Sequence, residues 1–163
     1  MYMTDPEIRR FAIEELMQAN AQSHSAGFTK AQYEMLAAFL HHVRQYAHFS
    51  ELAAQVAGLT ARQYQALLAI KGFPNREEIT IGELAEQLQI TQRGALGLVN
   101  RLVGQNLIAR KQSAEGRRQV YVELTQRGAE ILEHLVGTHR REMRRLGPRL
   151  EIALGSLMQD HTQ

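Results

Sequence analysis

The side chains best suited to chemistry in this sequence are the arginines of one short segment. Between residues 93 and 118 a single acidic residue, Glu115, stands among basic ones. The basic residues are Arg93, Arg101, Arg110, Lys111, Arg117 and Arg118. The formal charge of the whole chain is only +2, so this segment is much more positive than the rest. Clustered arginines attract phosphates, and their forked donors also fit guanine edges, so we expect this segment to contact double-stranded DNA.

Residues 91–101 also carry the side-chain types that read base edges. On a helix capped by Thr91, Arg93 can donate two hydrogen bonds to guanine, Gln92 can pair with adenine, and Leu96 can touch a thymine methyl group. We therefore predict a DNA-binding set made of two parts, the outward face of this helix and the hairpin after it. The set is Thr91, Gln92, Arg93, Leu96, Gly97, Asn100, Arg101, Arg110, Lys111, Arg117 and Arg118.

Two helices and a hairpin are needed to position these side chains. Apolar residues recur at helical spacing over 80–90 and 91–106, which gives two faces that can pack together. Two ordinary core helices would show the same spacing. Residues 107–124, however, follow at once as a short strand, a basic hairpin and a return strand. This order is typical of a winged helix-turn-helix.

Helix starts are marked by a repeated Thr-x-x-Gln/Glu pattern, in which the two side chains cap the helix reciprocally. The pattern occurs at Thr29 with Gln32, Thr60 with Gln63, and Thr80 with Glu83. We expect helices over about 5–22, 29–57 and 60–72, with a break allowed near Ser50, and a loop over 72–79. After the hairpin, Thr125 should cap a helix that Gly147 and Pro148 break, followed by a short helix over 149–157.

The predicted fold is mainly α with a small β-hairpin wing, a winged helix-turn-helix with N- and C-terminal dimerisation helices. We expect an extra N-terminal helix in 1–28, dimerisation helices in 29–57 and 125–163, and the DNA-binding domain in 58–124. Narrow apolar stripes run along both long helices: Tyr33, Leu36, Leu40 and Val43, and Ile131, Leu135, Met143 and Leu146. Such stripes favour a homodimer in which the helices of two chains interleave. A monomeric helical cap over the winged domain is the alternative.

The stretch LVNRLVGQNLIARKQSAEGRRQVYVELTQRG resembles the MarR (multiple antibiotic resistance regulator) family. The matching pieces are Leu107, Ile108 and Arg110 in the strand, Arg118 in the wing, and Leu124, Thr125 and Gly128 at the end of the return strand. The resemblance continues upstream through LTARQYQALLAI and covers about residues 30–146. It implies a winged-helix dimer that binds palindromic operators, usually as a repressor released by a small molecule.

Two positions depart from the family pattern. Gly116 stands where the family usually has a wing aspartate, with Glu115 beside it, so a bracing carboxylate contact in the wing is in doubt. Asn106 replaces the usual turn glycine before the strand. Asparagine tolerates the left-handed backbone conformation that such a turn requires, so we expect the turn to form.

For an effector, the resemblance points to the crevice between the dimerisation helices and the winged lobe. Aromatic and polar residues that can line an amphipathic pocket for a small aromatic acid or phenol are His42, Tyr46, Phe49, Tyr64 and His134. Packing in the core is the competing role for each of them.

Other classes of function are weaker. The histidines at 41, 42, 48, 134 and 139 suggest a metal-responsive regulator, but their spacing matches no metal-binding motif, and we assign no metal and no cofactor. No nucleophile elbow, phosphate-binding glycine loop or dinucleotide fingerprint is present, so we do not expect an enzyme. A winged-helix module that binds proteins and not DNA is the remaining alternative.

Composition limits the compartment and the partners. The 163 residues contain no cysteine, are 44% hydrophobic and 22% charged, and show no apolar run of the roughly 18 to 20 residues that span a bilayer. The sequence begins with the charged MYMTDPEIRR and not with a signal-like pattern. We expect a globular cytoplasmic protein with no membrane partner.

Overall fold

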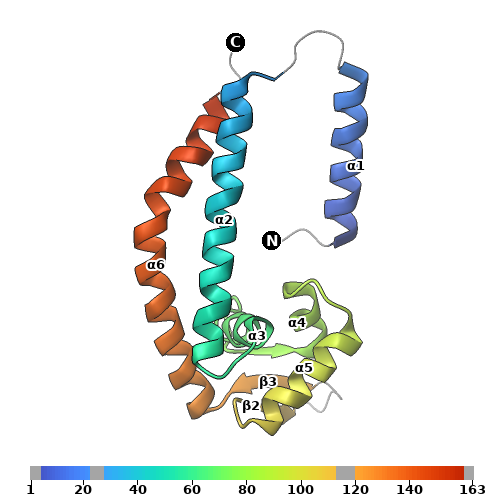
Figure 1. Ribbon diagram of the computed structural model, residues 1–163. Helices are drawn as coiled ribbons and strands as arrows, with labels where there is room; N and C mark the ends of the chain where they lie inside the picture. The colour runs from blue at the N-terminus through green and yellow to red at the C-terminus, as the bar shows by residue number, and fades with distance from the viewer. Residues whose placement is uncertain (1–4, 23–27, 113–119, 160–163) are drawn as a thin grey trace. The chain divides into compact units, whose positions relative to one another are not determined.

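The computed structural model describes residues 5–22, 28–112 and 120–159. The chain divides into two compact units. One contains the described residues up to Ser50 and those from His139 onward, and the other is Glu51–Thr138. Two long helices, α2 (Lys30–Val56) and α6 (Gln126–Gln159), run through both units (Figure 1). None of the described helices combines the length and the apolar content needed to cross a membrane.

The unit Glu51–Thr138 holds a winged helix-turn-helix. Its elements within the unit are α3 (Ala61–Lys71), β1 (Glu78–Thr80), α4 (Ile81–Gln87), α5 (Gln92–Gly104), β2 (Ile108–Gln112) and β3 (Val120–Leu124). The sheet is antiparallel, in the order β1-β3-β2, with Ile79 opposite Val122 and Ile108 opposite Leu124. The mainly α fold with a small hairpin wing, predicted from the sequence, is confirmed.

One apolar core holds this unit together. The inward sides of α3, α4 and α5 meet one face of the sheet, where Leu67, Ile70, Leu84, Leu102 and Val122 are fully buried. Full burial of one such side chain stabilises the fold by about 1.5 to 3 kcal/mol. The position of α5 is therefore fixed from its inner face, which leaves its outer face available for contacts.

The capping patterns were accurate guides to the helix starts. Thr60 and Thr80 both form complete capping boxes, with Gln63 and Glu83 respectively. Thr29 does the same with Gln32, through a backbone hydrogen bond of 2.7 Å to the glutamine oxygen and a return bond of 3.3 Å.

Two expectations were wrong, and the break that the sequence allowed near Ser50 does not occur. Residues 72–79 do not end as a loop, because Glu78 and Ile79 pair with β3. The helix α2 passes through Ser50 unbroken, and α6 passes through Pro148. A proline inside a helix removes one backbone hydrogen bond. Leu146 and Ala153 lie on either side of Pro148, seven residues apart on one face, and both are buried, so packing keeps the two halves in one helix.

The dimerisation stripes are only partly exposed. Leu135 and Leu146, which we expected to need a second chain, are already buried within one chain. Ile131 is half-buried against the core of its own chain. The remaining large side chains of the stripes stay open to solvent: Tyr33 at 60%, Leu36 at 48%, Leu40 at 42%, Val43 at 41% and Met143 at 44%.

Candidate nucleic-acid interface

The helix α5 presents a polar, basic face with its N-terminus open. Thr91 caps it, and the threonine hydroxyl accepts a hydrogen bond of 3.1 Å from the backbone of Gly94. Ala95, Leu98, Val99 and Leu102 are buried in the core. On the other side Gln92, Arg93, Leu96, Asn100 and Arg101 are exposed, as predicted, and Gly97 is half-buried. The free backbone N–H groups and the helix dipole at this end both favour an anionic partner.

A strained residue fixes the turn between α4 and α5. Gln89 has a φ of 52°, in the left-handed region that non-glycine residues avoid. The turn closes through a hydrogen bond of 2.9 Å from the backbone N–H of Ile90 to the carbonyl of Ala85. This conformation sets the direction in which α5 leaves the turn.

The two predicted bases of β2 point to opposite faces of the sheet. Arg110 donates a hydrogen bond to the side-chain oxygen of Asn100, which joins the wing to the exposed face of α5. Lys111 instead forms ion pairs with Glu78 at 3.1 Å and Glu123 at 3.4 Å. The hydrogen bonds that the exposed Lys111 ammonium donates to these two carboxylates raise its pKa. Arg110 is therefore the better placed of the two to extend the α5 face.

Two wing residues of the predicted interface, Arg117 and Arg118, lie outside the described residues, as does Gly116, so the expected lack of a bracing carboxylate contact stays a prediction. Arg93, Arg101 and Arg110, by contrast, are all exposed within the winged unit.

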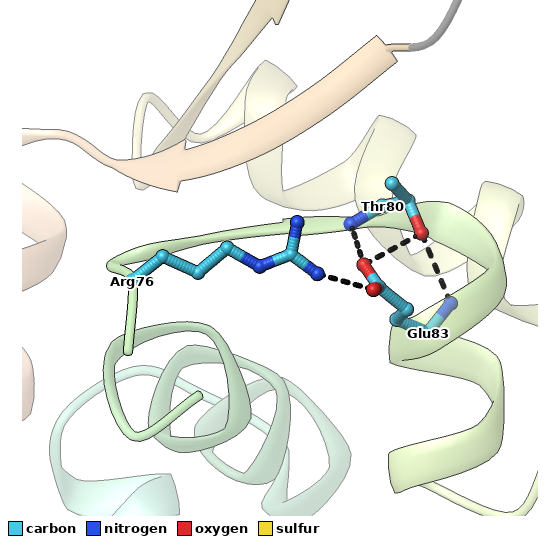
Figure 2. Close-up of polar contacts among 3 residues, drawn as sticks. All are labelled: Arg76, Thr80 and Glu83. Atoms are coloured by element: carbon cyan, nitrogen blue, oxygen red, sulfur yellow. Dashed lines mark hydrogen bonds and ion pairs between the residues drawn. The ribbon is translucent and has the colours of Figure 1, made fainter. Parts of the chain in front are cut away.

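An ion pair that the sequence did not reveal ties the loop before β1 to α4. In Figure 2 the guanidinium of Arg76 reaches the carboxylate of Glu83, which also accepts hydrogen bonds from the backbone and hydroxyl of Thr80, at 2.9 and 2.8 Å. Arg76 also lies over the rings of Phe73 and Tyr121, at 4.6 and 5.5 Å. The Thr80–Glu83 spacing was visible in the sequence, but no local sequence pattern indicates which residues Arg76 contacts.

The pKa of Glu83 reflects this environment. Partial burial alone would raise the pKa of the carboxyl group. The hydrogen bonds from Thr80 and the charge and hydrogen bond of Arg76 outweigh it and hold the pKa of Glu83 below its usual value. The contacts at the start of α4 therefore favour the ionised form of Glu83.

The Leu-Thr-x-x-Gly motif fastens α6 to the turn between α5 and β2. Asn106 has the expected left-handed conformation, with a φ of 56°. The hydroxyl of Thr125 donates to the carbonyl of Asn106 at 2.8 Å and accepts from the backbone of Gly128 at 3.1 Å. A Cβ at Gly128 would lie 1.9 Å from the carbonyl oxygen of Leu107, so only glycine fits there.

The predicted effector residues fall into separate surroundings. Tyr46 and Phe49 both contact the ring of His139, at 6.0 and 5.5 Å between centroids, and burial raises the pKa of Tyr46. His139 is buried and lies 3.0 Å from the hydroxyl of Ser50. From the sequence, His139 is only a metal candidate, since nothing in the spacing shows which aromatic residues surround it.

The other three effector candidates lie on three different helices, and His42 shares a face of α2 with Tyr46 and Phe49, four and seven residues before them. His42, on α2, contacts Gln45 at 3.2 Å. Tyr64 is buried in the core of the winged unit, and His134 is exposed on α6. A cavity of about 380 Å³ in the winged unit is lined by none of the five. Within the described ranges, no three histidine or acidic side chains converge in a way that would hold a metal ion.

Comparison with known proteins agrees with this geometry. The sequence pattern of the MarR family matches residues 57–119. Over 78 residues the chain is 35% identical to the organic hydroperoxide resistance transcriptional regulator of Bacillus subtilis. That match covers 48% of this chain and spans only about half, 51%, of the relative.

Solved structures share the fold. The chain resembles AbsC, a MarR family transcriptional regulator from Streptomyces coelicolor, with a TM-score of 0.63 and 20% identity, over 83% of this chain and 97% of that one. It also resembles a variant of MepR from Staphylococcus aureus bound to an oligodeoxyribonucleotide, with a TM-score of 0.57 and 18% identity, over 82% and 93% of the two chains.

Proposed function

Because the chain belongs to the MarR family of transcriptional regulators, we propose that it binds a palindromic DNA operator as a homodimer and represses transcription until a small ligand releases it. The observation that carries the proposal is the face of α5. Its capped N-terminus, Gln92 and Arg93 are exposed together, and Arg110 contacts Asn100 two turns farther along the same face. These are the groups that a helix entering the major groove needs.

Each part of the interface has a proposed role. Arg93, Gln92 and Leu96 read base edges, whereas Thr91, Gly97, Asn100 and Arg101 fit the helix against the backbone. Arg110, Lys111, Arg117 and Arg118 form the wing, which follows the minor groove and phosphates. Of these, Lys111 has to exchange two carboxylate partners for phosphate and so contributes less than Arg110.

The relatives support a DNA partner. The Bacillus subtilis relative is named a transcriptional regulator, and the Staphylococcus aureus neighbour was solved with an oligodeoxyribonucleotide. A salt titration tests the proposal on this chain. Affinity for random duplex should fall steeply and linearly with salt on logarithmic axes, because lysines and arginines release counterions from phosphates. An interaction module without DNA binding would show no measurable complex at any salt concentration.

The proposed signal is a small organic ligand. Two-fold dimers read half-sites about 34 Å apart, so a ligand that changes the separation of the two α5 helices lowers operator affinity. The proposed effector set remains Tyr46, Phe49, His42, Tyr64 and His134. These 163 residues contain no cysteine, so peroxide should not release the operator in a way that a thiol reductant reverses. Such a reversal would contradict this part of the proposal.

A further inference from the structure

The N-terminal helix α1 (Asp5–Gln22) buries nothing within its own chain. From Pro6 to Ala19 every side chain is exposed, and the large apolar ones include Phe11 at 56%, Leu16 at 71% and Met17 at 69%. Most helical stability in proteins comes from packing an apolar face, and none of the α1 side chains from Pro6 to Ala19 is buried. This helix therefore needs a partner surface.

One face of α1 has the pattern of a docking face. Ile8, Phe11, Ala12, Leu16 and Ala19 recur at intervals of three and four residues, and Glu15 lies within the same stripe. Among the described residues, no ion pair involves Glu15. A carboxylate that is covered by an apolar surface needs a cation against it, so the partner surface must offer one.

The outer flank of α6 offers such a surface. Met143, Gly147, Leu154 and Met158 form a stripe at helical spacing, and the three methionine and leucine side chains are 44 to 69% exposed. A Cβ at Gly147 would meet nothing within 4 Å, so there is room for another helix to approach closely. Arg144 lies at the edge of this stripe, and no ion pair joins it to any residue that the structure describes.

The charges of the two helices are complementary. Helix α1 has four acidic and two basic residues, whereas residues 140–149 of α6 have five arginines and one glutamate, which is already paired with Arg145. A negative helix is also a poor ligand for an anionic membrane surface, where basic amphipathic helices bind. Charge thus favours α6 as the surface that covers α1.

We propose that α1 packs in trans on the Met143–Gly147–Leu154–Met158 stripe of a second copy of the chain, with Glu15 beside Arg144. The proposal rests on the dimer of the proposed function and adds to it an arm that reaches across to the partner. The arm supplies an apolar cover for a flank of α6 that one chain leaves exposed.

Engineered cysteines test this directly, because the chain has none of its own. Chains with Leu16→Cys and one tag are mixed with chains carrying Met143→Cys and a second tag, and are then oxidised. The matched control is Met17→Cys, since Met17 is 69% exposed, close to the 71% of Leu16, but points away from the stripe. We expect doubly tagged covalent dimers to form about tenfold faster with Leu16→Cys than with Met17→Cys, as proximity raises the effective concentration.

A charge exchange adds a second readout on the same pair of chains. Glu15→Arg in the Leu16→Cys chain should slow cross-linking, and Arg144→Glu in the Met143→Cys chain should restore it. Equal rates for Leu16→Cys and Met17→Cys, or cross-linking only inside a chain that carries both cysteines, would overturn the trans arm. Light scattering distinguishes the two negative outcomes. A dimer that does not cross-link contradicts the trans arm but leaves the proposed function intact. A monomer contradicts both the trans arm and the proposed function.

Discussion

At the residue scale, the central side chain is Arg93, exposed in the first turn of α5. Replacing it with alanine should cost about 1 to 3 kcal/mol on the preferred operator and little on random duplex, because an arginine that reads guanine contributes sequence discrimination. The measurement is the affinity of the original chain and of Arg93→Ala for the operator and for random duplex at several salt concentrations.

The contrasting variant replaces Arg117 and Arg118 together. These wing arginines should weaken operator and random DNA alike and reduce the salt dependence by about one to two counterions per protomer. A loss confined to the operator from the wing pair, or a uniform loss from Arg93→Ala, would reverse the two roles.

Gln89 is a second residue whose effect can be predicted, since its φ of 52° is strained for a side chain with a Cβ. Gln89→Gly should raise the free energy of unfolding by up to about 1 kcal/mol, because relief of the strain exceeds the added entropy of the unfolded chain. Gln87→Gly is the matched control at the end of α4, where helical glycine costs up to about 1 kcal/mol. Urea unfolding at one protein concentration gives the free energy of unfolding of both variants. If the two substitutions changed this free energy in the same direction, Gln89 would not be strained.

At the scale of elements, the start of α4 should respond to acid. The pKa of Glu83 is lowered in the folded chain, so the stability that its ionised form contributes is complete above the usual glutamate pKa of about 4.3 and is lost as the pH falls through the lower, folded value. Glu83→Gln retains an acceptor for Thr80, as Gln63 does for Thr60. The stability gap between the original chain and this variant should therefore shrink below about pH 4.

The exposed Glu86 on the same helix provides the control. Glu86→Gln should leave the acid limb of the unfolding curve unchanged, since no ion pair joins Glu86 to any residue that the structure describes. A stability gap for Glu83→Gln that stays constant from pH 7 to pH 3 would mean that the ion pair with Arg76 does not stabilise the helix start.

The junction of α6 with the α5–β2 turn makes an opposite pair of predictions for two glycines. Gly128→Ala places a Cβ against the carbonyl of Leu107, which is held by a 3.1 Å hydrogen bond from Thr125, and should destabilise the fold by about 3 kcal/mol. Gly104→Ala, with open space around it, should stabilise α5 by up to about 1 kcal/mol. Thermal unfolding measures both, and tolerance of Gly128→Ala would show that the turn can move.

The same elements show what the sequence could and could not predict. Capping residues such as Thr60, Thr80 and Thr91 act on neighbours three residues away, so the sequence located these helix starts. The strand β1 is three residues long and exists only because Ile79 pairs with Val122, far along the chain. Pro148 was misjudged for a similar reason, since burial of Leu146 and Ala153 outweighs a local breaking signal.

The candidate site was predictable to the same extent. The exposed face of α5 follows from helical spacing alone, and the sequence identified it correctly. The ion pairs of Lys111 with Glu78 and Glu123 depend on strand order, and the contact of Arg110 with Asn100 depends on how α5 meets the sheet. Contacts of this kind, between segments that are apart in the sequence, cannot be predicted from the spacing of residue types along the chain.

At the scale of the whole molecule, the account requires that two copies of α5 read DNA together. A dimer with exposed stripes on α2 and α6 brings two recognition helices to half-sites that are separated by about one turn of the duplex, or about 10.5 base pairs. In the proposed function, operator recognition depends on dimerisation, because neither half-site alone provides the full affinity.

The most direct test is the affinity of the protein for its selected operator and for the same operator with five base pairs inserted at the centre. The insertion turns one half-site to the opposite side of the duplex. We predict that affinity falls to the level of random duplex, a loss of at least about 10³-fold. Equal affinity for the two operators would contradict the account, because the chain would then be reading DNA without a dimer of fixed spacing.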